Sequence, residues 1–300
     1  MRFGLLGTGP WAELAHGPAL QAHPEAELVG VWGRRPEAAA DIAGRFGARP
    51  YADVDALLAD CDAVAVALPP DVQAPLAVRA ARAGRHLLLD KPVATTAAAA
   101  REVAGAVAES KVASVVFFTL RFRPETVRWI EEQRAAGGWQ LGRADWLSSI
   151  HDSGGSDSPF AVSPWRREKG GLWDVGPHAL SVLLPLLGDV ADLEGSVAAV
   201  AGPGDLVQLA LRHTSGAVGT CALGHTAAPA AAGTAVELRG AAGTAVMPEG
   251  KTDAVAAFGS AVDALLDSVR TGRAHPCDIR FGLRVTEILA AAQDRLGAGR

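Results

Sequence analysis

The stretch Phe3-Gly4-Leu5-Leu6-Gly7-Thr8-Gly9-Pro10-Trp11-Ala12 stands close to the start of the chain and decides its fold. Phe3–Leu6 is a short apolar run that ends in glycine, which is typical of a buried parallel strand. Gly7 permits a tight turn from strand to helix, and Gly9 lets the backbone approach a pyrophosphate. Ala12 lets the helix pack closely on the strand, with the helix N-terminus facing the phosphates. The stretch therefore predicts a dinucleotide-binding Rossmann domain.

The end of the second strand bears on which dinucleotide is bound. A helical segment reaches about Ala22, and the next strand is predicted at Glu27–Trp32. NAD-specific folds place an acidic residue after this strand, where it binds the ribose 2′-hydroxyl. Here Gly33-Arg34-Arg35 follow, and guanidinium groups bind a 2′-phosphate through charge-assisted hydrogen bonds. The sequence predicts NADP, with Arg34 as the main contact and Arg35 as the second. The alternatives are NAD, or two solvated arginines that precede a helix.

The strand–helix alternation continues and carries a lysine to the end of a strand. Asp90-Lys91-Pro92 follow a predicted strand, and ligands of doubly wound sheets bind beyond the carboxyl ends of the strands. The predicted elements of this part are a helix at Pro36–Phe46, a strand at Ala63–Leu68, a helix at Val72–Ala83, a strand at His86–Leu89, a helix at Ala97–Glu109 and a strand at Val112–Leu120.

Composition excludes several classes of protein. The chain has 300 residues, is 49% hydrophobic and carries a formal charge of −5, which argues against a nucleic-acid surface. Its three cysteines form no CxxC pair, so we expect neither a disulfide framework nor a cysteine zinc site, and a reducing cytoplasm fits best. Glycines break the first apolar run, so we do not interpret it as a signal peptide. No uninterrupted apolar run reaches the roughly 18 residues of a membrane span.

After Leu120 the pattern changes to many short β-type runs. Turn signals such as Thr214-Ser215-Gly216 separate several of them, which predicts a mostly antiparallel open sheet with helices on one face. We expect a Rossmann domain at 1–120 and an α+β domain at 121–300. The predicted strands are Arg143–Ile150, Glu194–Ala201, Leu206–Arg212, Val218–Leu223, Ala235–Arg239 and Thr244–Met247, the predicted helices are Arg121–Ala136, Val255–Arg270 and Phe281–Leu296, and His151–Ser158 is expected to be a mobile loop.

The second half holds a candidate acid/base pair in Gly170-Gly171-Leu172-Trp173-Asp174-Val175-Gly176-Pro177-His178. Asp174 and His178 are four residues apart, so a helix that starts near Asp174 would place both on one face. A histidine beside a carboxylate is held in one tautomer and exchanges protons readily. The other interpretation is a capping aspartate and a satisfied core histidine. A metal site is the weakest interpretation, because no third ligand has a recognisable spacing.

In this order, the segments resemble the Gfo/Idh/MocA oxidoreductase family, named for glucose–fructose oxidoreductase and inositol dehydrogenase. The resemblance covers nearly the whole chain: the glycine turn matches the nucleotide loop, Asp90-Lys91-Pro92 matches the Glu-Lys-Pro signature, and the segment from Gly170 to His178 matches the catalytic segment of the second domain. Arg121-Phe122-Arg123-Pro124 and Glu237-Leu238-Arg239-Gly240 with Gly243 also look like family landmarks.

The resemblance implies roles for individual residues. Lys91 is implied as the catalytic lysine, His178 as the acid/base, and Asp174 as the group that binds or orients the substrate. Self-association through the open sheet is also implied, giving a homodimer or homotetramer. The candidate cofactor contacts are Gly7, Thr8, Gly9, Pro10, Trp11, Ala12, Arg34, Arg35, Leu68, Pro69, Gln73, Asp90 and Lys91, and the candidate substrate contacts are Arg121, Trp165 and Arg166.

Two departures from the family pattern lie near the lysine. Asp90 replaces the usual glutamate, and Gln73 stands where the family often has a histidine. The sequence therefore leaves three functions open. The first is reversible hydride transfer between NADP and a secondary alcohol or ketone of a sugar, cyclitol or related polyol. The second is an NADP-binding sensor without turnover, and the third is a lyase or glycosidase type of enzyme that recycles its bound nicotinamide.

Overall fold

The computed structural model describes residues 1–152 and 158–298, and the chain divides into two compact units. The first unit contains Met1–Arg123 and Thr252–Arg284, and the second contains Pro124–Lys251 and Val285–Arg300. The predicted division at residue 120 differs from this grouping at residues 121–123 and 252–284, and the later segment joins the first unit because its helix packs on the first sheet. Much of the predicted loop His151–Ser158 lies outside the described residues.

The first unit is built on a six-stranded parallel sheet in the order β3-β2-β1-β4-β5-β6. This is the strand order of a doubly wound Rossmann fold, so the predicted fold class is confirmed. The strands are β1 (Arg2–Leu6), β2 (Glu27–Trp32), β3 (Arg49–Tyr51), β4 (Ala63–Val66), β5 (His86–Asp90) and β6 (Ser114–Phe117). Strand β4 in the middle of the sheet and strand β6 at its edge are both buried along their whole length, as strands covered on both faces must be.

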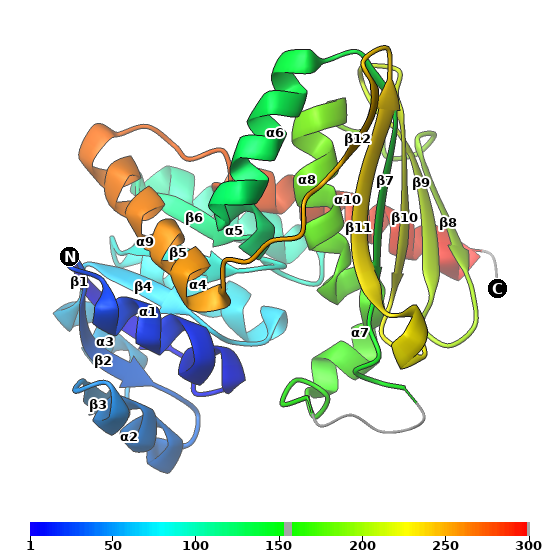
Figure 1. The fold of residues 1–300 in the computed structure, drawn as a ribbon. Helices are drawn as coiled ribbons and strands as arrows, with labels where there is room; N and C mark the ends of the chain where they lie inside the picture. The colour runs from blue at the N-terminus through cyan, green and yellow to red at the C-terminus, as the bar shows by residue number, and fades with distance from the viewer. Residues whose placement is uncertain (153–157, 299–300) are drawn as a thin grey trace. The chain divides into compact units, whose positions relative to one another are not determined.

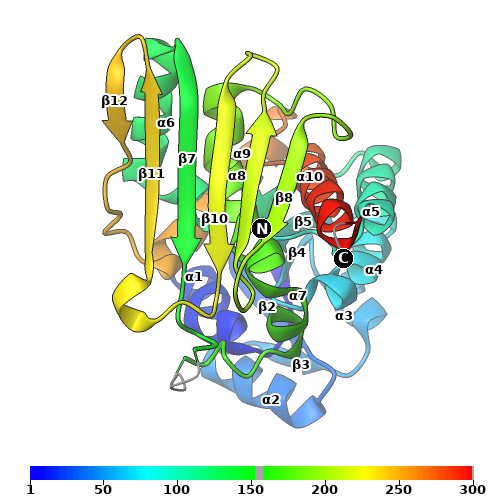
Figure 2. The ribbon, with the colours of Figure 1, turned by 90° about the vertical axis from the view of Figure 1, so that its right-hand side faces the viewer.

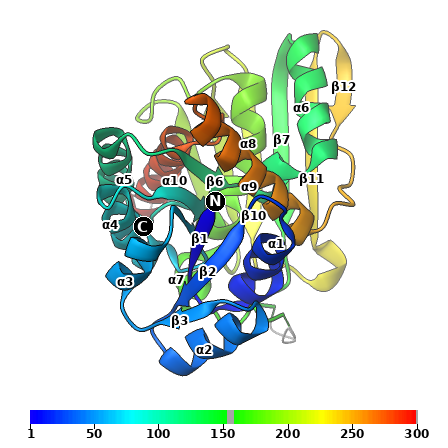
Figure 3. The same cartoon turned by 90° about the vertical axis from the view of Figure 1, so that its left-hand side faces the viewer.

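Helices cover both faces of this sheet. Figure 3 shows α3, α4 and α5 on one side of it and α1 and α9 on the other. The helices are η1 (Ala12–His16), α1 (Gly17–Ala22), α2 (Pro36–Arg45), α3 (Val54–Asp60), α4 (Pro70–Arg82), α5 (Ala97–Ser110), η2 (Thr119–Phe122) and α9 (Ala254–Thr271).

Helix α9 explains why a late segment belongs to the first unit. It packs against β5, β6, η1 and η2, and its residues Phe258, Ala261 and Leu265 are fully buried. Burial of such an apolar stripe stabilises the unit by about 25 cal/mol for each Å² removed from water. The next helix, α10 (Ile279–Ala298), begins in the first unit and ends in the second.

The second unit contains a six-stranded sheet in the order β12-β11-β7-β10-β9-β8. Figure 2 shows this sheet face-on. All neighbouring pairs are antiparallel except β7 and β10, so the predicted mostly antiparallel sheet is confirmed. The strands are β7 (Trp139–Leu147), β8 (Val197–Ala201), β9 (Val207–Arg212), β10 (Val218–Gly224), β11 (Gly233–Gly240) and β12 (Gly243–Val246).

One face of the second sheet is covered and the other is open. Helix α8 (Gly176–Leu187) packs on β7 and β10, and α6 (Pro124–Ala136) packs on α8, both behind the sheet in Figure 2. Helix α7 (Pro164–Asp174) precedes α8, and a short helix, η3 (Pro229–Ala231), precedes β11. The alternating burial of β9 follows this one-sided packing. Within residues 1–152 and 158–298, no helix is both long and apolar enough to cross a bilayer.

Candidate functional site

The turn after β1 has the geometry that its glycines predict. Gly7 has a φ of +127°, and a Cβ placed on it would lie 2.3 Å from the carbonyl oxygen of Ala67. Its N–H donates to the carbonyl oxygen of Trp32 at 2.8 Å. Only glycine combines this φ with this closeness to the neighbouring strand. A Cβ on Gly9, by contrast, would meet nothing within 4 Å, so there is open space above the backbone.

The residues around this turn fit a dinucleotide phosphate. Ala12 is buried where the helix meets the sheet, while Thr8, Pro10 and Trp11 are half-buried. The Thr8 side chain packs against Gly33, where an added Cβ would lie 2.6 Å from the threonine methyl group. A bare backbone at Gly9 and a helix that starts beside it are what anion binding at a helix N-terminus requires.

Two exposed arginines follow β2. Arg34 and Arg35 are both exposed, and Arg35 is the N-cap residue of α2, whose first turn contains Pro36. Their guanidinium groups are accessible at the carboxyl end of β2, the edge of the sheet at which Gly7 turns. This position fits contact with the adenosine ribose or its phosphate.

Lys91 lies at the same edge, after β5. Its side chain is only 7% exposed, and its N–H donates to Oδ1 of Asp90 at 2.8 Å. The Lys91–Pro92 peptide bond is cis. Leu68 and Pro69 follow β4 and are half-buried, and Pro69 is the N-cap residue of α4. Most of the predicted cofactor contacts thus lie together at the carboxyl-terminal end of the first sheet, where β1, β2, β4 and β5 end.

Gln73 is fully buried in α4, and its amide binds backbone on both sides of Lys91. Nε2 donates to the carbonyl oxygens of Asp90 at 2.8 Å, Pro92 at 3.1 Å and Val93 at 3.3 Å. Oε1 accepts the N–H of Asp90 at 2.9 Å. These partners fix the orientation of the amide, because three carbonyls face one end and an N–H faces the other.

In the second unit, Asp174 is held by two basic side chains. Nε of Arg166 donates to Oδ2 of Asp174 at 2.9 Å, and Nε2 of His225 lies 3.1 Å from the same oxygen. All three residues are buried, with exposed fractions of 9%, 6% and 1% for Arg166, Asp174 and His225. Nδ1 of His225 lies 2.7 Å from the hydroxyl oxygen of Ser148. A buried carboxylate paired in this way stays in a fixed position.

The prediction that Asp174 and His178 share one helix face is wrong. Asp174 is the last residue of α7, while His178 lies in the first turn of α8. Pro177 stands in that first turn, as its residue type predicts. The His178 ring stacks on Trp146 of β7 with centroids 4.6 Å apart, and the residue is 6% exposed. Packing on the sheet, rather than helix spacing, orients this imidazole.

Asp205 holds the segment that begins at Gly170 against the sheet. Its carboxylate accepts the N–H of Gly171 at 2.9 Å and the N–H of His225 at 2.8 Å, as well as the Thr226 hydroxyl at 2.9 Å. Burial alone would raise the pKa of Asp205, but the hydrogen bonds from His225, Thr226 and Gly171 lower it below its usual value. Gly171 is required here, because a Cβ on it would lie 2.5 Å from Cα of Gly224.

Three of the residues around Asp174 carry no signal in the sequence. Ser148, Asp205 and His225 lie at strand ends far along the chain from Asp174, and no motif marks them. Of the predicted substrate contacts, Arg166 is the partner of Asp174, and Trp165 lies beneath its guanidinium, 4.9 Å from ring centroid to Cζ. Arg121 belongs to the first unit, with its Cζ 5.8 Å from the Phe281 ring centroid.

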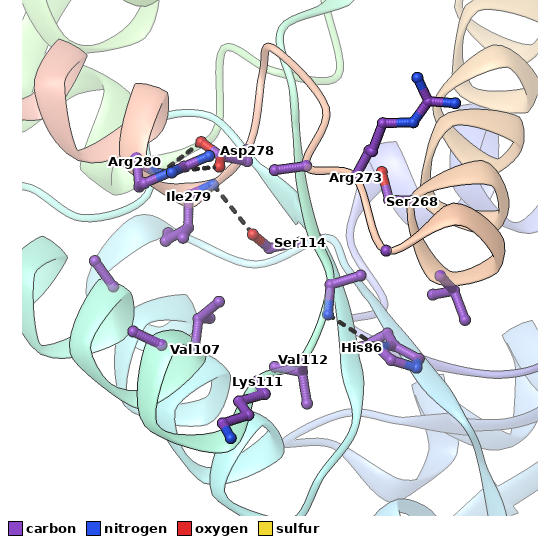
Figure 4. A pocket seen from close by; sticks show the side chains of 16 residues that line it. His86, Val107, Lys111, Val112, Ser114, Ser268, Arg273, Asp278, Ile279 and Arg280 are labelled. Carbon is purple, nitrogen blue, oxygen red and sulfur yellow. Dashed lines mark hydrogen bonds and ion pairs between the residues drawn. The ribbon is translucent and has the colours of Figure 1, made fainter.

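A cavity of about 390 Å³ lies elsewhere in the first unit. Figure 4 shows it between the start of β5 at His86, the end of α5 at Lys111 and the start of α10 at Ile279. These are the amino-terminal ends of the strands, opposite to the edge that carries Lys91. None of the predicted site residues lines it. The cavity is therefore not the predicted functional site, despite its volume.

The comparisons with known proteins agree with this geometry. The model of the Gfo/Idh/MocA oxidoreductase family, described as an NAD-binding Rossmann fold, matches residues 1–118. The model of the Gfo/Idh/MocA C-terminal domain matches residues 135–246. The chain belongs to the Gfo/Idh/MocA oxidoreductase family.

Individual relatives extend the match. Inositol 2-dehydrogenase of Rhizobium meliloti (strain 1021) is 31% identical over 226 residues, which are 72% of this chain and 66% of that enzyme, so the match spans just under two thirds of the relative. The structure of GenD2 from gentamicin A biosynthesis, in complex with NAD, is 25% identical with a TM-score of 0.83 and covers 100% of this chain and 95% of that chain. The WlbA dehydrogenase from Bordetella pertussis, in complex with NADH and UDP-GlcNAcA, has the same fold, with 22% identity, a TM-score of 0.84 and coverage of 100% and 96%.

Proposed function

We propose that this protein catalyses reversible, nicotinamide-dependent oxidation of a secondary alcohol on a sugar, cyclitol or related polyol. Family membership and the inositol 2-dehydrogenase relative support this reaction class. The observation that carries the proposal is the buried lysine, Lys91, at the same sheet edge as the bare turn at Gly9. Such a site needs a turn that binds the dinucleotide and a shielded amine close to it, and both lie at the carboxyl ends of the strands of one sheet.

The chain's own residues divide the work. Lys91 is proposed to bind the reacting oxygen and to exchange its proton, and His178 of the second unit is proposed as the second acid/base. In oxidation the hydroxyl proton passes to one of these two groups, and in reduction protonated Lys91 polarises the carbonyl oxygen. Asp174, held by Arg166 and His225, is proposed to bind the substrate hydroxyls. The bound nicotinamide supplies or accepts the hydride.

The finer cofactor choice is also part of the proposal. We infer a preference for NADP, because Arg34 and Arg35 are exposed after β2 and stand where NAD-specific folds place an acidic residue. A guanidinium group binds a 2′-phosphate as a charge-assisted pair, whereas NAD offers it only a neutral hydroxyl.

The buried cysteines bear on the cellular setting, and one exposed face of the second sheet bears on the assembly. The three cysteines are free and buried, which favours a reducing compartment such as the cytoplasm. On the open face of the second sheet, Leu141, Val200, Val218 and Val246 have exposed fractions of 51%, 66%, 39% and 60%. Leu141 and Val218 are register neighbours, so their side chains share this face. We infer that a second copy of the chain covers it, and sedimentation over a range of concentrations measures the resulting mass.

The test is turnover of a panel of sugars, cyclitols and polyols with NADP and with NAD, for the wild type and for Lys91→Met. We expect one or more substrates to be oxidised, with NADP preferred. Lys91→Met should lower turnover by at least about 100-fold, because a positioned acid/base contributes about 10²–10⁴-fold. Its affinity for NADPH, measured by quenching of tryptophan fluorescence, should stay within severalfold.

Other results would favour the other functions. NADPH binding without turnover on the panel, in either direction, would favour a sensor. Product formation without net change in NADPH would favour an enzyme that recycles its nicotinamide. Unchanged turnover in Lys91→Met would remove the lysine from the mechanism.

A further inference from the structure

The side chain of Gln73 forms hydrogen bonds with four backbone atoms of the segment that carries Lys91. The sequence position of Gln73 predicts a contact with the cofactor, which is a different role. Gln73 is 0% exposed, so its side chain is buried inside the first unit and does not face solvent. Both ends of its amide are engaged by backbone of residues 90–93. We propose that Gln73 is a positioning residue that fixes the backbone on both sides of Lys91 and thereby places the lysine amine.

The contacts lie where they control the lysine most directly. Asp90 is bound through both its N–H and its carbonyl group, immediately before Lys91. The carbonyl groups of Pro92 and Val93 are bound after it, at 3.1 and 3.3 Å. With both flanks held, the Cα of Lys91 has little freedom to shift. Rotation of the segment would break several hydrogen bonds at once.

The carboxylate of Asp90 completes this arrangement. Its Oδ1 accepts the N–H of Lys91 at 2.8 Å, so the one backbone N–H between the two held flanks is also bound. Proline at position 92 has no N–H to satisfy. The lysine segment therefore depends on Gln73 and Asp90 together, which are the two departures from the family pattern that lie near the lysine.

A glutamine suits this task better than a carboxylate or an apolar side chain. Three carbonyl oxygens face Nε2, so a glutamate would bring a buried negative charge against three acceptors. A methionine of similar length would leave those carbonyls without their donor. A histidine, the residue that the family often has here, offers a ring N–H and so keeps part of the donor function.

The proposal rests on the proposed function of Lys91, and its test separates the two. The first readout needs no turnover: the rate at which Lys91 is dimethylated by formaldehyde and borohydride, followed by mass spectrometry between pH 6 and pH 10. In Gln73→Met we expect faster labelling and a changed pH profile, because the loosened segment exposes a lysine residue that is now only 7% exposed. The second readout applies to the wild type and to those variants that turn over a substrate. It asks whether a substitution changes kcat, KM or both.

We expect Gln73→Met to lower kcat by about 10- to 100-fold with little change in NADPH affinity, because a displacement near 1 Å costs about that much in rate. Gln73→His should recover part of kcat and of the wild-type labelling profile. The matched control is Val78→Ala in the same helix, which removes buried methyl groups and leaves the Gln73 hydrogen bonds to residues 90–93 in place. It should lower thermal stability but leave the labelling of Lys91 unchanged.

Equal labelling profiles in the wild type, Gln73→Met and Gln73→His would overturn the positioning role, whether or not a substrate is known. The same holds if Val78→Ala alters the profile as much as Gln73→Met does, since the effect would then be general destabilisation. If Gln73→Met does not fold, Gln73→His and Gln73→Asn decide the matter in the same assay. A wild type that shows no turnover would contradict the proposed function alone.

Discussion

His16 gives the fold a pH dependence that can be measured directly. Its imidazole is fully buried, stacks on the Phe258 ring with centroids 3.9 Å apart and meets the Phe117 ring edge-on. Among the described residues, neither ring nitrogen has a hydrogen-bond partner. Burial lowers the pKa of His16 to about 3, from 6.5. The folded chain therefore keeps this ring neutral at pH values at which the unfolded chain protonates it.

The size of the effect follows from the two pKa values. Because the folded pKa is depressed, the ring costs no stability above pH 6.5. Between pH 6.5 and pH 3 the free energy of unfolding falls by about 1.4 kcal/mol for each pH unit. Between pH 7.5 and pH 4.5, His16 therefore removes about 3 kcal/mol. His16→Leu should escape this loss, because leucine fills a similar volume and does not titrate.

Urea unfolding at pH 7.5 and pH 4.5, followed by circular dichroism, measures the difference. At pH 7.5 we expect the variant to be at least as stable, since buried polar atoms without partners cost about 1–3 kcal/mol and the ring stack contributes about 0.5–1.5 kcal/mol. His275, whose pKa burial lowers to about 4, is present in both proteins and cancels.

Phe258→Leu is the matched control, because it disturbs the same packing but keeps the imidazole. It should lower stability at both pH values and keep the wild-type dependence on pH. If His16→Leu loses as much stability as the wild type between the two pH values, the buried neutral imidazole is refuted as the cause.

Two further predictions concern the dinucleotide site. Arg34→Ala should weaken NADPH binding by about 10- to 100-fold, because a hydrogen bond to a charged group contributes about 1.5–3 kcal/mol, and should leave NADH binding almost unchanged. Equal losses for both dinucleotides in fluorescence titrations would contradict a role in 2′-phosphate binding. Gly7→Ala should cost about 2 kcal/mol or more, because it combines a positive φ with a Cβ 2.3 Å from the Ala67 oxygen. Gly9→Ala, whose Cβ meets nothing within 4 Å, should keep the stability but lose dinucleotide affinity, and a stable Gly7→Ala or a fully active Gly9→Ala in thermal melts and titrations would contradict this division of roles.

The sequence predicted the first sheet well because its signals are local. The glycine turn, the apolar strands and the Arg34 position depend on neighbours within a few residues, and β2 spans the residues that its pattern predicts. The three-residue edge strand β3 and the helix α3 were missed because they are short. A local signal did exist for α3, since the Asp53 side chain accepts the N–H of Asp55 at its N-terminus.

The second half of the site depends on contacts that spacing does not reveal. Asp174 and His178 suggested a single helix, but Gly170 has a φ of 65° within α7 and a separate helix starts after Asp174. The partners of Asp174 are Arg166, eight residues earlier, and His225, fifty-one residues later. The sequence marks the carboxylate but not the side chains that hold it, because β10 and α7 meet only in the folded unit.

The departures at Gln73 and Asp90 bear most directly on the choice between an enzyme and a sensor. In the sequence they count against catalysis, since both replace residues that are usual beside the lysine. In the folded unit the shorter Asp90 carboxylate bonds back to the N–H of Lys91, and the Gln73 amide binds the backbone on either side. A sensor that had lost its reaction would have no need to hold the backbone of the lysine segment so firmly. The proposed positioning role treats the two substitutions as one local arrangement that places Lys91, and variants of Gln73 and of Lys91 test the positioning and the enzymatic interpretation separately.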